Sequence, residues 1–277
     1  MFEYFDIHSH LNVPDFDLDR DEQIGKMKEQ KIGTTMVGVD FESSKNIVDL
    51  AGEHDNLFAC VGQHPDDLTP NSVFDDRLEL LANNKKTVAI GECGLDYFRL
   101  SSMLGGDGLK GIQKTVFEYH IDLALSVGKP LMLHVRPSKG TMDAYADTLD
   151  VLEHHAKLSG NKLKGNAHFF AGDKDILKRF LDIGFTVSFT GVLTFTSDYD
   201  ELVRYTPLDM IMAETDAPFV APTPYRGQRN SPLYVPEVVK KIAELKAHSY
   251  KGVKEVLMAN VLRNFPQISA IAPQPEL

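Results

Sequence analysis

The chain has 277 residues, of which 43% are hydrophobic and 25% are charged, and its formal net charge is −11. This length fits one α/β barrel, and this composition is ordinary for a soluble globular protein. The negative charge argues against a protein that coats long nucleic acid through a basic surface, although one substrate phosphate could still be bound locally.

The N-terminus and the cysteines both favour a cytoplasmic protein. Glu3 and Asp6 occupy the region that is basic in a signal peptide, and no apolar run approaches the length of a membrane span. Cys60 and Cys93 are too few for a disulfide framework, so we expect two reduced thiols that behave as small buried hydrophobic residues.

Short apolar runs alternate along the chain with longer segments of helical period. The expected strands cover residues 3–8, 34–40, 57–63, 87–93, 130–135, 164–170, 185–191 and 209–215. The helical segments between them include residues 20–30, 43–54, 113–128 and 174–184. Glycine ends the last two of these, as is common at helix C-termini. This alternation predicts one (β/α)₈ barrel over residues 1–277, with a doubly wound open sheet as the alternative.

Two segments stand outside this alternation. Residues 98–111 form a Gly-rich connection after the fourth strand, which predicts either a flexible surface loop or a lid over a site. Residues 267–277 contain closely spaced small residues and prolines and are expected to be a frayed tail.

Ionisable residues gather at the C-terminal ends of the expected strands. They are His8, His10, His64, Glu92, His134, His168, Glu214 and Asp216. His8 and His10 lie on the same side of the first strand with Cα atoms about 7 Å apart, so their imidazoles can converge on one ion. The other residues follow five different strands, and a barrel brings all these ends together at its catalytic mouth. The pattern therefore predicts a divalent metal site there.

Each of these residues taken singly has an ordinary structural explanation. An HxH pair can be two solvent-facing histidines, and His134 alone could be a packed, hydrogen-bonded side chain. Glu92 is harder to explain, because an unpaired carboxylate after four apolar or small residues is costly to bury. The prediction of a metal site therefore depends on all these residues occurring together at the ends of different strands. The other histidines, which are expected in surface or packing roles within helices, are His54, His120, His154, His155 and His248.

Several motifs extend this pattern beyond single residues. They are DIHSHL (6–11), GQHP (62–65), AIGECGLDY (89–97), QKTVFEYHIDLA (113–124), PLMLHVR (130–136), HFFAG (168–172), ETDAPF (214–219), RGQRNSP (226–232) and VKEVLMANVLRNF (253–265). In these motifs the chain resembles the TatD family of metal-dependent deoxyribonucleases, within the amidohydrolase-like barrels. ETDAP followed by RG-x-RN-x-P is far more specific than HxH.

The resemblance implies a (β/α)₈ hydrolase barrel with two divalent metal ions, or up to three, and phosphodiester hydrolysis that is typically exonucleolytic on DNA. His8, His10 and Asp216 would hold one ion. His134 and His168 would hold the second, and Glu92 would bridge the two. Mg, Mn and Zn are all compatible with this ligand set.

The resemblance also implies roles around the metal ligands. His64 and Glu214 would act beside the ions by orienting a phosphate or transferring a proton, and Asp216 would also relay the proton of the attacking water. Asp6 would be structural or support a ligand. Arg136 is expected to bind substrate. Three residues of the eighth loop are expected either to bind substrate or to hold that loop in place, namely Arg226, Arg229 and Asn230.

One segment departs from the family pattern. After the fifth-strand histidine the family usually reads H-[ST]-R-[DE]-A, whereas this chain reads HVRPSKGTMDAYADT, so Pro137 replaces an acid and the loop is longer. This departure, with the Gly-rich segment, leaves substrate preference open.

Three functions are therefore compared. The first is a deoxyribonuclease that acts on DNA ends or short nucleic-acid fragments and needs neither a membrane nor an obligatory protein partner. The second is an esterase or amidase with the same metal site, for example on an aminoacyl ester. The third is a non-catalytic metal-binding partner module, which the presence of every expected ligand disfavours.

Overall fold

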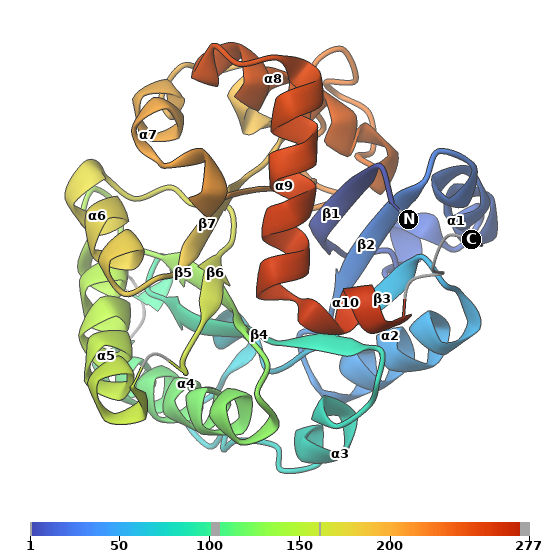
Figure 1. Ribbon diagram of the computed structural model, residues 1–277. Helices are drawn as coiled ribbons and strands as arrows, with labels where there is room; N and C mark the ends of the chain where they lie inside the picture. Colours follow the sequence, from blue (N-terminus) through green and yellow to red (C-terminus); the bar gives the residue numbers. More distant parts are fainter. Residues whose placement is uncertain (1, 101–105, 161, 272–277) are drawn as a thin grey trace.

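The computed structural model describes residues 2–100, 106–160 and 162–271, and its centre is a barrel of parallel strands (Figure 1). The strands follow one another around the sheet in chain order. They are β1 (Tyr4–Ser9), β2 (Ile32–Val37), β3 (Leu57–Val61), β4 (Thr87–Asp96), β5 (Leu131–Arg136), β6 (Gly165–Ala167), β7 (Thr186–Phe189) and β8 (Ile211–Ala213). The eight strands predicted from the sequence are thus confirmed, with boundaries that differ by a few residues.

The first and last strands meet along a short seam just beyond their ends. The backbone N–H of His10 donates to the carbonyl of Ala217 at 2.7 Å, and the N–H of Asp216 donates to the carbonyl of His8 at 3.0 Å. The carboxylate of Asp6 accepts hydrogen bonds from the backbone N–H and the hydroxyl of Thr215 at 2.8 and 2.5 Å. This seam makes the sheet a nearly closed barrel, so the open-sheet alternative is wrong.

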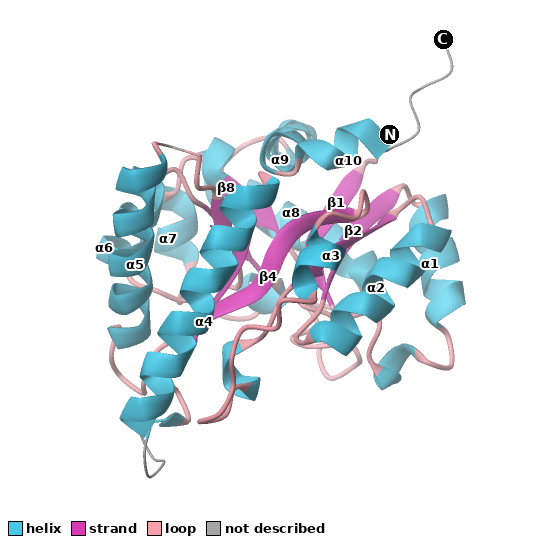
Figure 2. Ribbon diagram, turned by 90° about the horizontal axis from the view of Figure 1, so that it is seen from below, coloured by secondary structure: helices cyan, strands magenta, loops and turns pink. Residues whose placement is uncertain are grey.

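Helices alternate with the strands and surround the barrel (Figure 2). They are α1 (Arg20–Glu29), α2 (Phe41–Glu53), α3 (Leu78–Ala82), α4 (Gly106–Val127), α5 (Asp143–Ser159), α6 (Lys174–Asp182), α7 (Asp200–Tyr205), α8 (Val235–Lys246), α9 (Tyr250–Asn264) and α10 (Pro266–Ile271). Local capping residues begin several of them. Asp40 and Ser43 form a reciprocal capping box at α2, and Asp173 caps α6. None of the helices within the described ranges is long and apolar enough to cross a membrane.

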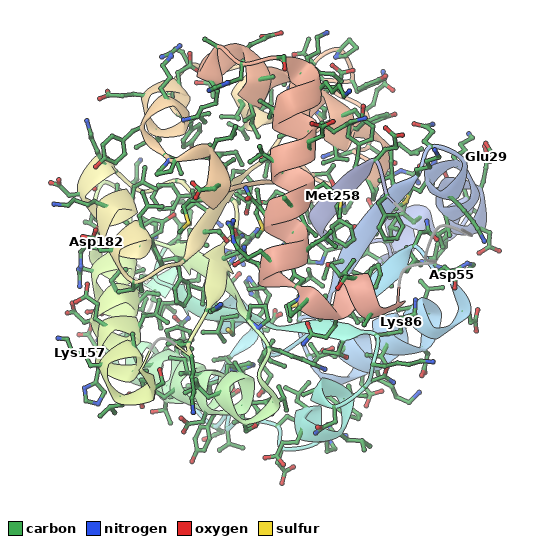
Figure 3. The ribbon with its side chains drawn as sticks, viewed as in Figure 1. Glu29, Asp55, Lys86, Lys157, Asp182 and Met258 are labelled. Atoms are coloured by element: carbon green, nitrogen blue, oxygen red, sulfur yellow. The ribbon has the colours of Figure 1, made fainter. Side chains whose placement is uncertain are left out.

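The apolar residues of the larger core cluster include Leu11, Met36 and Phe117. A separate apolar cluster fills the inside of the barrel and is closed by the last two helices. Phe5, Phe58 and Met132 from the strands pack in one cluster with Phe265 and Ile268. Met258 of α9 also packs against this cluster (Figure 3). Because Phe5 and Phe58 stand near the starts of their strands, α9 and α10 close the N-terminal end of the barrel. The opposite, C-terminal end is left for the site.

Two expectations about irregular segments are corrected. Residues 106–111 of the Gly-rich segment are the first turns of α4 rather than a loop or a lid, while residues 101–105 lie outside the described residues. The expected tail begins later than residue 267, because α10 continues to residue 271 and Ile268 is fully buried. Residues 272–277 lie outside the described part. Cys60 and Cys93 are both buried and free, as predicted.

Candidate metal centre

The strand ends bring one compact group of imidazoles and carboxylates together. His8 and His10 come from β1 and the residue after it, and Glu92 comes from the middle of β4. His134 lies in β5, His168 directly follows β6, and Asp216 lies three residues beyond β8. Asp216 adopts a left-handed backbone conformation with φ 54°, which aspartate tolerates better than most residues.

Four side-chain atoms surround one point on the β1 side of this group. Nε2 of His8 lies 3.2 Å from Nε2 of His10, 3.5 Å from Oε2 of Glu92 and 3.7 Å from Oδ1 of Asp216. Nε2 of His10 lies 3.9 Å from Glu92 and 3.6 Å from Asp216. Ligands bound tetrahedrally to zinc at about 2.0–2.1 Å stand roughly 3.3 Å from one another, so the four atoms are close to that arrangement.

The chemistry of the two β1 histidines supports a cation at this point. Nδ1 of His10 donates to the carbonyl of Val37 at 3.1 Å, so the Nε2 of a neutral His10 carries a lone pair. That lone pair faces Nε2 of His8, whose own Nδ1 has no hydrogen-bond partner among the residues that the structure describes. Two imidazole nitrogens held this close are stabilised by an ion between them, and the residues therefore fit a metal.

The other carboxylate oxygen of Glu92 faces a second group of side chains, which consists of His134 and His168 with His64 beside them. Oε1 of Glu92 lies 2.8 Å from Nε2 of His168 and 3.0 Å from Nδ1 of His134. The same oxygen is 3.7 Å from Nε2 of His64. One carboxylate thus offers an oxygen to each of two ligand groups, which is the geometry expected of a bridging ligand. Clusters of three metal-capable side chains occur on both sides of it.

Buried carboxylates hold the two histidines of the second group from behind. Nδ1 of His168 contacts Oε2 of Glu214 at 3.1 Å, and the backbone N–H of Phe169 donates to Oε1 of Glu214 at 2.5 Å. Nε2 of His134 contacts Oδ2 of Asp96 at 3.0 Å. A partner on the second nitrogen fixes the ring orientation and the tautomer of a ligating histidine.

Burial and the surrounding imidazoles set the ionisation of the site. Burial by itself raises the pKa of Glu92. The pKa is nevertheless well below the ordinary value, because four imidazoles stabilise the carboxylate; they belong to His168, His8, His64 and His134. Burial and the neighbouring His134 lower the pKa of His64 to about 3, so its imidazole is neutral at physiological pH. The backbone N–H of Asp66 donates to Nδ1 of His64 at 3.1 Å. The proton of neutral His64 therefore sits on Nε2, which points toward the centre.

A family model described as TatD related DNase matches residues 5–266. The chain belongs to this family. An uncharacterized metal-dependent hydrolase of Bacillus subtilis, YabD, is 34% identical over 94% of this chain and 98% of its own length. YcfH of Escherichia coli K12, also an uncharacterized metal-dependent hydrolase, is 32% identical over 94% of each chain. The crystal structure of YJJV, a TatD homolog from Escherichia coli, superposes with a TM-score of 0.81 at 23% identity, covering 95% of this chain and 98% of that one.

Membership of the TatD-related family makes the chain a metal-dependent hydrolase with a candidate metal site inside a family-typical barrel. The structure assembles all six expected ligands of this TatD-related protein, and His64 beside them. Glu214, expected to act beside the ions, is fully buried and does not line the cavity over the site. Its Oε2 lies 3.1 Å from Nδ1 of His168 and 3.9 Å from Nδ1 of His8, so it stands beside two expected ligands and forms a metal-capable cluster with them.

The cavity over the centre has a volume of about 760 Å³. Its polar wall is formed by four histidines and five charged side chains, among which Arg136 is the only cation of the described lining residues. They are His10, His64, His134, His168, Asp66, Asp67, Glu92, Asp216 and Arg136. The guanidinium of Arg136 lies 3.9 Å from the ring centroid of Phe98. The apolar wall is made of Val13, Val39, Val135, Pro137, Phe169, Ala171, Phe219 and Val220.

The remaining three residues expected at the substrate instead contact the eighth loop and its surroundings. Asn230 is fully buried and donates to the carbonyls of Thr215 and Phe219 at 2.8 and 2.5 Å. Arg229 forms an ion pair with Asp19 and lies over the ring of Phe16. Arg226 donates to the carbonyl of Ala221 at 3.1 Å and lies over Phe195. These contacts match the loop-holding role that was the alternative to substrate contact.

Two supporting residues in this TatD-related site were missed from the sequence, Asp96 and Gln113. Gln113 of α4 accepts from the backbone N–H of Asp96 at 2.9 Å, and its amide donates to the carbonyls of Asp96 and Pro65 at 3.0 Å each. It thereby ties the end of β4 to the segment after His64. A signal for Asp96 was present, since it stands four residues after Glu92 on the same strand and so points to the same side.

The helical histidines stay outside the centre. His120 is fully buried, with Nδ1 donating to the carbonyl of Val116 at 2.8 Å and Nε2 accepting from the backbone N–H of Gln63 at 2.9 Å. It supports the same segment as Gln113, and its predicted packing role is confirmed. His154 and His248 are exposed.

Proposed function

We propose that this protein is a divalent-metal-dependent phosphodiesterase that acts on DNA ends or short nucleic-acid fragments, as an exonuclease. The observation that carries the proposal is the placement of Glu92, whose two oxygens face two groups of metal-capable side chains. Two divalent ions about 3.5–4 Å apart are a recurrent arrangement in nucleases and phosphatases, and a carboxylate such as Glu92 would hold both. The description of the matching family as TatD related DNase supports the same reaction.

We assign the residues as follows. His8, His10 and Asp216 would hold one divalent ion, His134 and His168 a second, and Glu92 both. When bound, these ions would lower the pKa of a water and offset negative charge on the phosphate. Four imidazoles favour Zn or Mn, and the two carboxylates leave Mg compatible. His64 stands next to the second group, where a third ion or the substrate could be bound.

His64 and Asp216 would carry the proton and the hydrogen bonds of the reaction. The Nε2–H of His64 points toward the centre and is a donor for a phosphoryl oxygen. Asp216 lines the cavity with a carboxylate that is able to accept the proton of the attacking water. Glu214 would act indirectly, by holding the imidazole of His168 in its ligating orientation.

The charges around the cavity favour a short or terminal substrate. Arg136 is its only cation among the described lining residues. Asp66 is paired with Arg99 at 2.7 Å, whereas the carboxylate of Asp67 would repel a long phosphate backbone. Few phosphate contacts predict that binding depends only weakly on salt concentration. Free, buried Cys60 and Cys93 fit the proposed cytoplasmic location. No obligatory protein partner is part of this proposal.

A second candidate function is hydrolysis of an ester such as an aminoacyl linkage at the same metal centre. The segment that departs from the family pattern supports it, because Pro137 lines the cavity where the family usually carries an acid. Ser138 and Thr141 in this segment hydrogen-bond to Asp143 at the start of α5. The substrate wall is therefore built differently from the usual family sequence.

The test is digestion of an end-labelled single-stranded DNA oligonucleotide by metal-stripped protein resupplied with Mg, Mn or Zn. We expect a metal-dependent ladder with the wild type. Removal of a general base typically lowers the rate by about 10²–10⁴-fold, so Asp216→Asn should lose the ladder while remaining folded by circular dichroism. Labelling each end in turn gives the direction of cleavage. Cleavage of an aminoacyl ester but of no DNA would move the reaction to the second candidate.

A further inference from the structure

Phe219 is an exposed aromatic side chain on the wall of the metal cavity. Its exposed fraction is 57%, and its ring centroid lies 6.2 Å from the ring of His10 at an interplanar angle of 68°. Leaving so much apolar surface in water is unfavourable, and most large aromatic rings of the chain are buried or half-buried. The ring is therefore accessible to an apolar or flat group of a ligand that enters the cavity.

The backbone around Phe219 is held in one conformation. Its N–H donates to the carbonyl of Asp216 at 2.9 Å, and its own carbonyl accepts the side-chain amide of Asn230 at 2.5 Å. The backbone N–H of Asn230 donates to the carbonyl of Pro218 at 3.0 Å. The ring is thus carried on the same tight turn as the metal ligand Asp216, so its distance from the centre is set by the fold.

The residue after Phe219 adds a second sign of a binding site. Val220 has φ 47°, a conformation that is costly for a β-branched residue and that clusters at ligand-binding sites. The turn is packed so closely that a Cβ added to Gly191 would stand 2.6 Å from the carbonyl oxygen of Val220. The surrounding structure therefore holds the turn in this strained shape.

A second ring lies on the cavity wall beside the other ligand group. Phe169 directly follows His168, and its backbone is held by the hydrogen bond of its N–H to Glu214. Its ring centroid is 6.3 Å from that of His168. Aromatic surface therefore adjoins both sides of the metal centre, while the charged groups of the wall are mostly acidic.

We propose that Phe219 is a stacking platform for the base of the nucleotide whose phosphate is bound at the metal centre. This inference rests on the proposed function and names its substrate more closely, as an unpaired terminal nucleotide. Every base presents a flat π-face, so stacking gives affinity without sequence preference. It also needs no positive charge, which suits a cavity whose described lining residues include a single cation, Arg136.

The test compares two oligonucleotides, one ordinary and one whose terminal nucleotide is abasic. Alanine substitution of a stacking aromatic side chain weakens binding by about 5- to 150-fold per base. We expect the wild type to prefer the ordinary oligonucleotide by such a factor, mainly through KM. Phe219→Ala and Phe219→Leu should lose this preference by losing activity on the ordinary substrate alone, and Phe219→Tyr should keep it.

The matched control is Tyr205→Ala, which removes an exposed aromatic ring of α7 that does not line the cavity. It should leave the preference unchanged. Equal wild-type cleavage of both oligonucleotides, or equal losses on both in Phe219→Ala, would overturn the stacking role and leave the nuclease function standing. Cleavage of neither oligonucleotide with any of the three metals would overturn the proposed function and the stacking role together.

Discussion

Asp96 accepts a 3.0 Å hydrogen bond from Nε2 of His134, while Nδ1 of the same ring lies 3.0 Å from Glu92. The carboxylate is almost fully buried, and its other oxygen accepts the backbone N–H of Phe98 at 2.9 Å. Asp96 therefore cannot turn away from His134. It directs Nδ1 of the imidazole toward the second metal group, although it offers no atom to that group itself.

Replacing Asp96 should weaken metal binding at the second group while leaving the first group intact. Loss of a carboxylate behind a ligating histidine typically lowers metal affinity by about 10–100-fold. We expect this loss for Asp96→Ala and a smaller one for Asp96→Asn, because the amide oxygen can still accept from Nε2. Titration of metal-stripped protein with Zn, followed calorimetrically, would measure it. Equal affinity in wild type and both variants would contradict the positioning role.

Glu92→Gln should lower the number of metal ions bound per chain. An amide offers one oxygen and a neutral charge in place of the carboxylate whose two oxygens face His8 and His168 at 3.5 and 2.8 Å. Elemental analysis after dialysis against equal metal concentrations would count the ions. The control is Glu79→Gln, at an exposed carboxylate on α3. Unchanged metal content in Glu92→Gln would refute the bridging assignment.

The segment after β5 should make stability depend on pH through Asp143. Although burial by itself raises the pKa of Asp143, hydrogen bonds from Ser138, Thr141 and Ala144 lower it to about 2. The ordinary value is about 3.9, so the stabilisation is fully present above about pH 4 and is lost as the pH falls toward 2.

Asp143→Asn should accordingly unfold at a lower urea concentration than the wild type at neutral pH. The difference between the two midpoints should shrink as the pH is lowered below about 4, because the wild type then loses the charged acceptor. Urea titrations followed by circular dichroism at several pH values would measure both midpoints. A difference that is the same at every pH would show that the charge of Asp143 does not matter.

Truncation of Ile268 should destabilise the barrel from its closed end. Ile268 of α10 is fully buried in the cluster that also contains Phe5 and Phe265. Ile268→Ala should lower the free energy of unfolding by about 2–5 kcal/mol, from lost burial and the cavity left behind. Leu80→Ala, at a site that is 78% exposed, should change it by less than about 0.5 kcal/mol. Similar values for the two variants in urea unfolding would contradict the packing role of α10.

The sequence by itself determined the alternation of strands and helices and the set of metal-capable residues. Both are local properties, because strand period decides that His8 and His10 share a side, and parallel strands end at the same edge of a barrel. Where local signals were weak, the predictions were wrong. The glycines at 106–111 were read as a loop, although neighbouring helical turns and packing keep them in α4.

Only the tertiary structure decided which side chains support the ligands. Asp19 and Arg229 lie 210 residues apart and Asp6 and Thr215 lie 209 apart, yet each pair is in contact because β1 and β8 are neighbours in the closed barrel. The contact of Glu214 with His168 depends in the same way on the closed barrel, because it joins the ends of β6 and β8, which are separated by β7. Residue type and spacing predict that a side chain is able to bind a metal or a substrate. Its neighbours in the folded structure decide whether it lies toward the metal site, toward the cavity or behind a ligand.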